Sequence, residues 1–244
     1  MEQMKVIGRG KISTIYTDGI FAYKTYPDSF PTAWIDYEYQ THQAVFEHTD
    51  LTLIRYTYLK EQRQIQMDFI QGKTLADRMR KDKYKQGLDD FISLQVQIFN
   101  YKVPTLTQAA SVFKDQIDQS NLSLRLKEKA LISLNKIEPK NQLCHLDFHL
   151  ENILFDGQKY IIIDWVNAKS GNPVMDIARS YILLKQYAQR LSNKYLNLIC
   201  KTMHISPNKI KEAIPLMAFL RMLENDIDPF RPTLESLILE DSID

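Results

Sequence analysis

The chain has 244 residues, a formal net charge of +1 at pH 7 and a hydrophobic share of 44%. Such a balanced charge gives no electrostatic reason to expect binding to nucleic acid or to an anionic membrane surface. The apolar fraction is sufficient for a sizeable core and excludes general disorder. A chain of this length forms either one large domain or two smaller lobes.

Cysteine usage and the N-terminal residues predict a cytoplasmic protein. The two cysteines, Cys144 and Cys200, form no disulfide framework and are typical of a reducing compartment. The first ten residues carry charges and glycines where a signal peptide needs an apolar run. No stretch approaches the roughly 20 apolar residues of a membrane span. We therefore expect no membrane partner.

The N-terminal residues predict two strands, 4–7 and 12–16, joined by a glycine-containing turn. The run Gly-Arg-Gly-Lys-Ile-Ser-Thr-Ile matches a G-x-G-x-x-G-x-V pattern in which Ser13 stands at the third glycine. Gly8 and Gly10 would let the backbone approach a triphosphate, and Ser13 would add a hydroxyl donor. Two glycines at a turn are by themselves a weak signal. A Walker P-loop is excluded because no Gly-Lys-Ser/Thr triplet occurs.

The following segments complete an N-terminal set of five strands and one helix. Alternating apolar residues predict the strands, and Pro31 followed by helical spacing predicts the helix. These further strands are expected at residues 20–26, 51–59 and 64–70, and the helix at 31–47. A helix capped by Thr74 follows, then three helices between residues 88 and 137. The C-terminal helices are expected from Pro173 and at 191–203, 207–225 and 232–240.

The most informative stretch runs from Leu143 to Trp165. It begins with polar side chains at His145, Asp147, His149 and Asn152, and it continues with two apolar runs that Asp156-Gly157 separates. Asp-Gly between short apolar runs predicts a β-hairpin, because both residues tolerate positive φ. A hairpin brings its outer ends together, so Asn152 and Asp164 should face the same point.

Two carboxylates and an amide from one short segment suit phosphoryl transfer. The order H-x-D-x-x-x-x-N, a hairpin and Asp-aromatic resembles the protein-kinase signature. The run His-Leu-Asp-Phe-His-x-x-Asn-Ile-Leu followed by Ile-Ile-Asp-Trp is more similar to the aminoglycoside phosphotransferase and choline kinase-like branch of that superfamily. Members of that branch phosphorylate hydroxyl groups of small molecules such as aminoglycosides, choline and homoserine.

The resemblance implies roles for the residues of the central stretch. Asp147 would be the catalytic base, while Asn152 and Asp164 would be ligands of Mg²⁺. The cofactor would be ATP or GTP, and the partner a small-molecule hydroxyl acceptor. Leu146 departs from the family, which usually has Gly before the base, and Leu150-Glu151 replaces a common Pro-Gly.

The resemblance also implies a nucleotide site in the N-terminal third of the chain. Lys24 matches the kinase lysine that contacts the α- and β-phosphates, and it would join Gly8, Gly10 and Ser13. Glu38 is the expected partner of Lys24, with Glu47 as the second choice. The segment from Met67 to Gly72 resembles the hinge, in which the backbone of Asp68 and Ile70 would contact the adenine edge. Asp176 matches a family aspartate that supports the catalytic loop, although an acid in a first helical turn is equally compatible with that position.

The implied fold is α+β: a bilobal protein-kinase-like fold with a five-stranded antiparallel sheet and one helix in its N-terminal lobe. The division expected from the sequence is an N-terminal lobe of residues 1–69 and a mainly helical C-terminal lobe of residues 70–244.

Three other functions are weighed against small-molecule phosphorylation. A protein kinase needs a long activation segment, but only eleven residues separate Asp164 from Asp176. A catalytically degenerate nucleotide-binding regulator is compatible with the same motifs and is the main alternative. A metal hydrolase that uses His145, Asp147 and His149 would need more imidazoles than the five histidines of the chain favour.

Charge near the C-terminus suggests a cationic acceptor. From Glu212 to Asp244 there are eight acidic residues and two basic ones. Glu224, Asp226 and Asp228 follow an expected helix end and are the candidates for contacting an amino-sugar or amino-alcohol. A solvated acidic tail explains the same composition.

Overall fold

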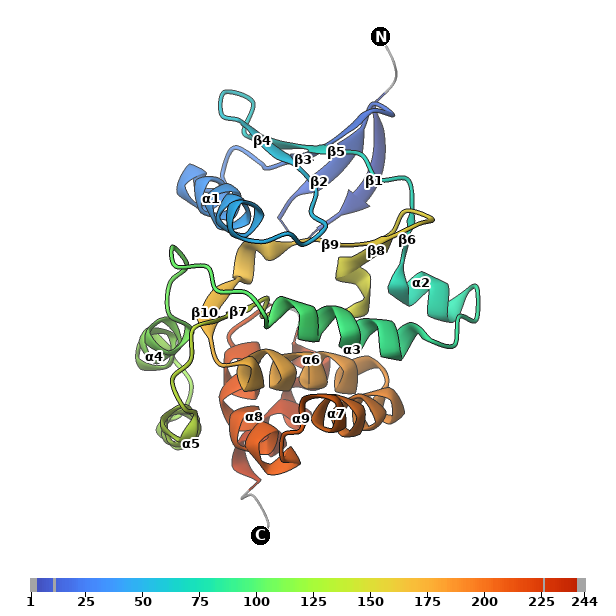
Figure 1. Ribbon diagram of the computed structural model, residues 1–244. Helices are drawn as coiled ribbons and strands as arrows, with labels where there is room; N and C mark the ends of the chain where they lie inside the picture. The colour runs from blue at the N-terminus through green and yellow to red at the C-terminus, as the bar shows by residue number, and fades with distance from the viewer. Residues whose placement is uncertain (1–3, 11, 226, 241–244) are drawn as a thin grey trace. The chain divides into compact units, whose positions relative to one another are not determined.

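The computed structural model describes residues 4–10, 12–225 and 227–240 (Figure 1). Its contacts divide the chain into two compact units. Unit 1 comprises residues 1–84 and 150–167, and unit 2 comprises residues 85–149 and 168–244. Within the described ranges, no helix is long and apolar enough to cross a membrane.

Unit 1 contains the expected five-stranded antiparallel sheet. Its strands pair in the order β1-β2-β3-β5-β4, so β5 lies between β3 and β4. The strands are β1 (Lys5–Arg9), β2 (Thr14–Thr17), β3 (Phe21–Thr25), β4 (Tyr56–Leu59) and β5 (Gln64–Asp68). The turn from β2 to β3 is built on Asp18, whose Oδ1 accepts the N–H groups of Ile20 at 2.9 Å and Phe21 at 2.7 Å. Gly19, with φ of 94°, supplies the left-handed residue that this turn needs.

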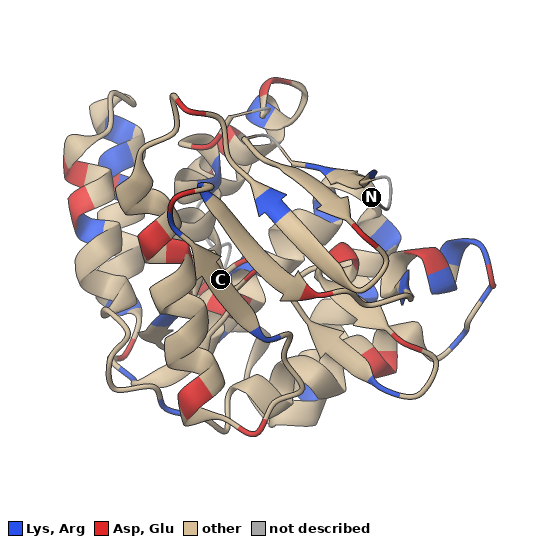
Figure 2. Cartoon of the chain, turned by 90° about the horizontal axis from the view of Figure 1, so that it is seen from above, with Lys and Arg blue, Asp and Glu red and all other residues tan. Residues whose placement is uncertain are grey.

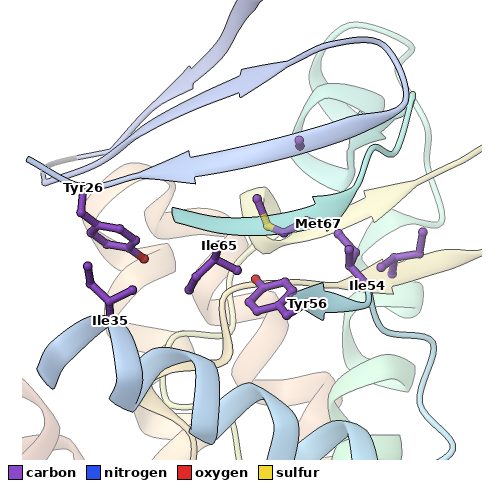
Figure 3. Packing of buried hydrophobic residues seen from close by; sticks show 8 residues of the cluster. Tyr26, Ile35, Ile54, Tyr56, Ile65 and Met67 are labelled. Atoms are coloured by element: carbon purple, nitrogen blue, oxygen red, sulfur yellow. The ribbon is translucent and has the colours of Figure 1, made fainter. Parts of the chain in front are cut away.

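One helix, α1 (Thr32–His48), packs on this sheet. Figure 3 shows Tyr56 of β4, Ile65 of β5 and Ile35 of α1 in one apolar cluster with Tyr26, which directly follows β3. The cluster also contains Ala22, Ile54, Met67 and Ile161. Ile35 and Ile65 are fully buried, which fixes α1 against β5, the strand that pairs with β3 at Lys24. Burial of one such side chain contributes about 1.5–3 kcal/mol.

A second, three-stranded sheet of unit 1 contains the predicted hairpin. Its order is β6-β8-β9, with β6 at Lys73–Thr74, β8 at Ile153–Phe155 and β9 at Tyr160–Ile162. Asp156 Oδ1 accepts the N–H groups of Gln158 and Lys159 at 2.8 Å, and Gly157 has φ of 105°. The hairpin predicted from Asp-Gly is confirmed. Unit 1 also holds α2 (Leu75–Arg80) and two 3-10 turns, Leu150–Asn152 and Trp165–Asn167.

Unit 2 is mainly helical. Its helices are α3 (Gly87–Ile98), α4 (Ala109–Gln119), α5 (Leu124–Lys136), α6 (Pro173–Tyr187), α7 (Gln189–Met203), α8 (Pro207–Met222) and α9 (Arg231–Leu239). A two-stranded sheet joins β7 (Gln142–Cys144) to β10 (Lys169–Gly171), and a 3-10 turn spans Asp228–Phe230. Both cysteines are buried in this unit.

Local sequence signals account for the starts of two of these helices. Asn172 caps α6 by accepting the N–H of Val174 at 3.1 Å, and Pro173 occupies the first turn. Ser206 caps α8 in the same way, with its hydroxyl 3.3 Å from Asn208 N. Figure 2 shows Lys and Arg interspersed with Asp and Glu along the chain, in keeping with its balanced net charge.

Most expected elements end within a few residues of their observed ends, and two larger differences remain. The strand expected at 51–59 is shorter, because only Tyr56–Leu59 pairs with a neighbour. Before it, Ile54 is buried in the cluster and its carbonyl accepts a hydrogen bond from His42 Nε2 at 2.7 Å, so that carbonyl is satisfied by a side chain. The expected lobe division at residue 69 also differs from the contact division. Residues 150–167 group with unit 1 through pairing of β8 with β6.

Candidate active site

Lys24 lies between two carboxylates of unit 1. Its Nζ is 2.6 Å from Glu38 Oε1 on α1 and 3.8 Å from Asp164 Oδ1 after β9. Tyr26 OH donates to the second Glu38 oxygen at 2.5 Å, so both oxygens of Glu38 are engaged. Glu47, the second choice as partner, is an exposed residue near the end of α1. Of the two glutamates considered from the sequence, Glu38 is therefore the partner of Lys24.

The charges around Lys24 keep it protonated. Burial alone would lower its pKa, but the carboxylates of Asp164 and Glu38 outweigh this effect and the pKa is raised. Burial, followed by the charge of Glu38, raises the pKa of Tyr26, so the phenol stays a neutral donor. Lys24 therefore presents a fixed positive charge in a largely buried position, with 16% of its side chain exposed.

Asn152 and Asp164 lie at the two ends of the hairpin. The N–H of Ile163 donates to the Asn152 carbonyl at 3.0 Å, which ties these ends together. Asp164 has φ of 64°, in the left-handed region. Its Oδ1 is buried and makes no hydrogen bond within the described part of the chain. Such a carboxylate oxygen, together with a nearby Asn, fits Mg²⁺, which prefers hard oxygen ligands.

The residues expected to bind the nucleotide also lie in unit 1. Gly8 is in β1, and Gly10 N donates to Ser13 O at 2.8 Å in the turn that precedes β2. Lys11 of this turn is outside the described residues. Ser13 is buried, with 8% exposed.

The predicted hinge leads from β5 into β6. Asp68 ends β5, and Ile70 lies in the extended connection and packs against the apolar cluster. In that connection a Cβ on Gly72 would stand 2.3 Å from Phe155 O, so only glycine allows this close approach to the hairpin.

Asp147 belongs to unit 2, in the loop after β7, and this loop is tied to α6. Asp176, fully buried on α6, accepts the N–H of Leu146 at 2.6 Å and of His145 at 3.2 Å. Ser180, one turn later on the same helix face, donates to Phe148 O at 2.7 Å. The prediction that Asp176 supports this loop is confirmed.

Asp176 supports the loop at an electrostatic cost. Burial raises its pKa to about 6, although the N–H groups of Leu146 and His145 oppose this rise. Leu146 itself has φ of 62°, a conformation that L side chains adopt with strain. The glycine that the family usually has at this position would adopt it at little cost.

An imidazole and a guanidinium lie near the carboxylate of Asp147. His149 Nε2 is 3.7 Å from its Oδ2, and Arg179 Nη2 is 3.7 Å from its Oδ1. His145 is fully buried, and its Nδ1 accepts the N–H of Asp147 at 3.3 Å. Among the described residues, no three His, Cys, Asp or Glu side chains are grouped to hold a metal ion.

The acidic residues expected at the acceptor site lie in different surroundings. Glu224 is held by Arg179 and Arg221, each at 2.5 Å. Asp228 is 92% exposed, and Asp226 lies outside the described residues. Sequence reasoning missed both arginines, because nothing in their local sequence sets them apart from helix surface residues.

The sequence motif that contains the expected catalytic residues has parts in both units. Asp147 lies before the point, between His149 and Leu150, at which the chain passes from unit 2 to unit 1. Asn152 and Asp164 lie after it. Each unit thus holds its own set of polar groups: Lys24 with Asp164 in unit 1, and Asp147 with Arg179 in unit 2.

Comparisons with known proteins show the family and the fold of the chain. A family profile described as "Phosphotransferase enzyme family" (APH) matches residues 71–199, more than half of the chain. None of the curated proteins compared with the chain matches its sequence.

Solved structures show the same fold at low sequence identity. A thermostable mutant of aminoglycoside phosphotransferase APH(4)-Ia, in ternary complex with ADP and hygromycin B, has a TM-score of 0.67 and 12% identity, with 97% of this chain and 90% of that chain covered. The gentamicin complex of APH(2")-IIa has a TM-score of 0.64 and 13% identity, covering 99% and 92%. A choline/ethanolamine kinase family protein from Mesorhizobium loti has a TM-score of 0.62 and 12% identity, covering 97% and 85%. The chain therefore has the fold of these small-molecule kinases and belongs to the phosphotransferase enzyme family.

Proposed function

We propose that this protein transfers the γ-phosphoryl group of ATP, or of GTP, to a hydroxyl group of a small molecule, with Mg²⁺ as the metal. The observation that carries the proposal is the position of Lys24, which is paired with Glu38 at 2.6 Å and lies 3.8 Å from Asp164. A fixed cation beside a carboxylate whose Oδ1 makes no hydrogen bond in the described structure suits a metal-bound triphosphate.

The residues would divide the chemistry as follows. Lys24 binds the α- and β-phosphates, and Glu38 and Tyr26 hold it in place. Asp164 and Asn152 would hold the metal, and the metal would supply positive charge to offset that of the phosphates. Asp147 orients the acceptor hydroxyl and takes its proton. The hydroxyl oxygen then forms a bond to the γ-phosphorus as the bond to the ADP oxygen breaks.

The class of acceptor is a separate proposal. Two of the solved relatives were crystallised with the aminoglycosides hygromycin B and gentamicin. An amino-sugar or amino-alcohol acceptor, in contact with Glu224, Asp226 and Asp228, stays a prediction. Against it stands the engagement of both Glu224 oxygens by arginines.

A phosphate-transfer screen tests the proposed activity. The protein is incubated with ATP or GTP and Mg²⁺ against aminoglycosides, amino-alcohols, polyols, hydroxy acids and nucleosides, and both nucleoside diphosphate and phosphorylated acceptor are measured. Melting curves with nucleotide, with and without Mg²⁺, are recorded in parallel. We expect a Mg²⁺-dependent rise in melting temperature and at least one phosphorylated product. A Mg²⁺-dependent shift without product would instead favour the degenerate regulator.

A further inference from the structure

Two arginines of unit 2 hold the carboxylate of Glu224 beside Asp147. Arg179, on α6, places Nη2 2.5 Å from Glu224 Oε1 and 3.7 Å from Asp147 Oδ1. Arg221, on α8, places Nη1 2.5 Å from Glu224 Oε2. Each oxygen of Glu224 therefore has its own guanidinium partner, and the cluster adjoins the expected catalytic base.

The arginines are fixed more firmly than the glutamate. Both lie within helices, and only 5% and 7% of their side chains are exposed. Arg221 Nη2 also lies 3.4 Å from Gln186 Oε1. Glu224 comes after the end of α8 at Met222, and 39% of its side chain is exposed. The cationic part of the cluster is thus built into the fold, whereas its carboxylate comes from a connecting segment.

The charges of the cluster balance only while Glu224 is in place. Arg179 and Arg221 offset the carboxylates of Glu224 and Asp147. Nε of each arginine is buried and has no hydrogen-bond partner within the described ranges. A buried guanidinium left without its carboxylate is strongly unfavourable, so this position demands an anion. A planar fork of N–H donors matches a carboxylate better than a neutral hydroxyl.

We propose that Arg179 and Arg221 form the part of the acceptor site that binds a carboxylate of the acceptor, and that Glu224 occupies it when no acceptor is bound. This inference rests on the proposed kinase function. A carboxylate is favoured over a phosphate because the group in place is itself a carboxylate with one oxygen on each arginine. The 3.7 Å between Arg179 and Asp147 places this anion position within the length of a small hydroxy acid from the base.

A melting experiment tests the anion position without any turnover. Glu224→Gln keeps the shape of the side chain and removes its charge. Glycerate is added at constant ionic strength, with chloride as the reference anion. We expect glycerate to raise the melting temperature of Glu224→Gln by about 3 °C or more, and that of the wild type by less than about 1 °C. Glu212→Gln is the matched control, since Glu212 lies on α8 and pairs only with Lys209 within the described ion pairs, at 3.5 Å.

A second variant shows whether the arginines bind an added anion or only form an ion pair that stabilises the fold. In the double variant Arg221→Gln with Glu224→Gln, the response to glycerate should be lost. If Glu224→Gln does not respond, or if the double variant responds equally, the arginines only stabilise the fold and the proposal is wrong. Inorganic phosphate is tested in the same way. A response to phosphate with none to glycerate would assign the position to free phosphate and overturn the acceptor proposal.

Turnover then tests the acceptor class. Two matched sets differ mainly in charge: glycerate, glycerol and serinol, and gluconate, sorbitol and glucamine. We expect kcat/KM to be at least about tenfold higher for the carboxylate of each set than for the amine. Glu224→Gln should lower KM for the carboxylate, because an internal competitor has been removed.

A preference for the amines would overturn this inference while leaving the kinase proposal intact. Absence of product from every member would count against the kinase proposal, and the melting experiment would still decide the anion position.

Discussion

Asp176 accepts the backbone N–H of Leu146 at 2.6 Å, across 30 residues of chain. This bond, together with the one from His145, fixes the residues that directly precede Asp147. Both partners belong to unit 2, so the position of the expected base is set within that unit. The support depends on a fully buried carboxylate, which makes it sensitive to pH.

Asp176→Asn should change how stability depends on pH. The pKa of Asp176 is raised from 3.8 to about 6 on folding. The folded state therefore binds more protons than the unfolded state between about pH 4 and 6. The stabilisation present below pH 4 is lost as pH rises through 6, by on the order of 3 kcal/mol. Urea unfolding of wild type and variant from pH 4 to 7 measures this difference.

The matched control for that experiment is Asp118→Asn. Asp118 is an exposed acid of α4 that pairs with Lys114 at 2.6 Å. Its replacement should leave the pH dependence parallel to that of the wild type. If the curve of Asp176→Asn also runs parallel to that of the wild type, the raised pKa is not a property of the folded protein.

Leu146 allows a test of backbone strain. At φ of 62°, replacement by Gly should give a more stable protein than replacement by Ala, by about 1 kcal/mol. Both variants lose the buried side chain, so their difference isolates the backbone. At Leu143, which is buried in β7, the order should reverse, with Ala more stable than Gly. Denaturant unfolding of the four variants measures which of Gly and Ala is more stable at each position. A more stable Ala variant at residue 146 would contradict the backbone strain.

The pair formed by Lys24 and Glu38 predicts a graded loss of activity. Lys24→Ala should lower kcat/KM for the nucleotide by ~10²-fold or more, because it removes a fixed charge from the phosphates. Glu38→Gln should cost only about tenfold, since Gln can still hydrogen-bond but no longer pairs with the ammonium. Glu47→Gln, at an exposed position of the same helix, is the control and should stay close to wild type. If Glu47→Gln is the damaging change, the partner of Lys24 in the working enzyme is not Glu38.

Asp147→Asn should leave nucleotide affinity nearly intact while kcat falls by ~10²–10⁴-fold. The amide keeps the size of the side chain but cannot accept the proton of the acceptor hydroxyl. Steady-state kinetics and nucleotide titration of the same preparation give the two quantities. Turnover within a few-fold of wild type would exclude Asp147 as the base.

Asp164→Ala should weaken nucleotide binding only when Mg²⁺ is present. The change removes the carboxylate whose Oδ1 is buried without a hydrogen bond in the described structure. Calorimetry with ATP in Mg²⁺ and in EDTA separates the metal-dependent part of the affinity. Identical isotherms for variant and wild type in Mg²⁺ would rule out Asp164 as a metal ligand.

Elements with local signals could be predicted from the sequence. Asp156-Gly157 specifies the hairpin because its turn is satisfied by its own backbone and side chains. The helices followed from their apolar spacing. The segment before Tyr56 was predicted as strand and is not one, because an apolar run packs into a core whether or not its backbone pairs. The spacing of apolar residues indicates which side chains are buried, but it does not distinguish a strand from an extended loop with buried side chains.

Some polar groups of the site could also be predicted from local sequence, and others could not. Asp147, Asn152 and Asp164 stand in one short motif that the sequence displays. Arg179 and Arg221 come from two helices 42 residues apart, and they meet at Glu224 only because α6 packs on α8. A contact of this kind cannot be predicted from the residues that are neighbours in the sequence. The order of the strands, with β5 inserted between β3 and β4, depends likewise on tertiary packing.

The division of the chain also gives each unit a natural spectroscopic or chemical probe. Both tryptophans, Trp34 and the buried Trp165, belong to unit 1, and both cysteines belong to unit 2. Burial raises the pKa of Cys144 and of Cys200, so their thiols should react with alkylating reagents only when unit 2 opens. Tryptophan fluorescence and thiol labelling of the unaltered protein can therefore show whether the two units unfold in one step or in sequence.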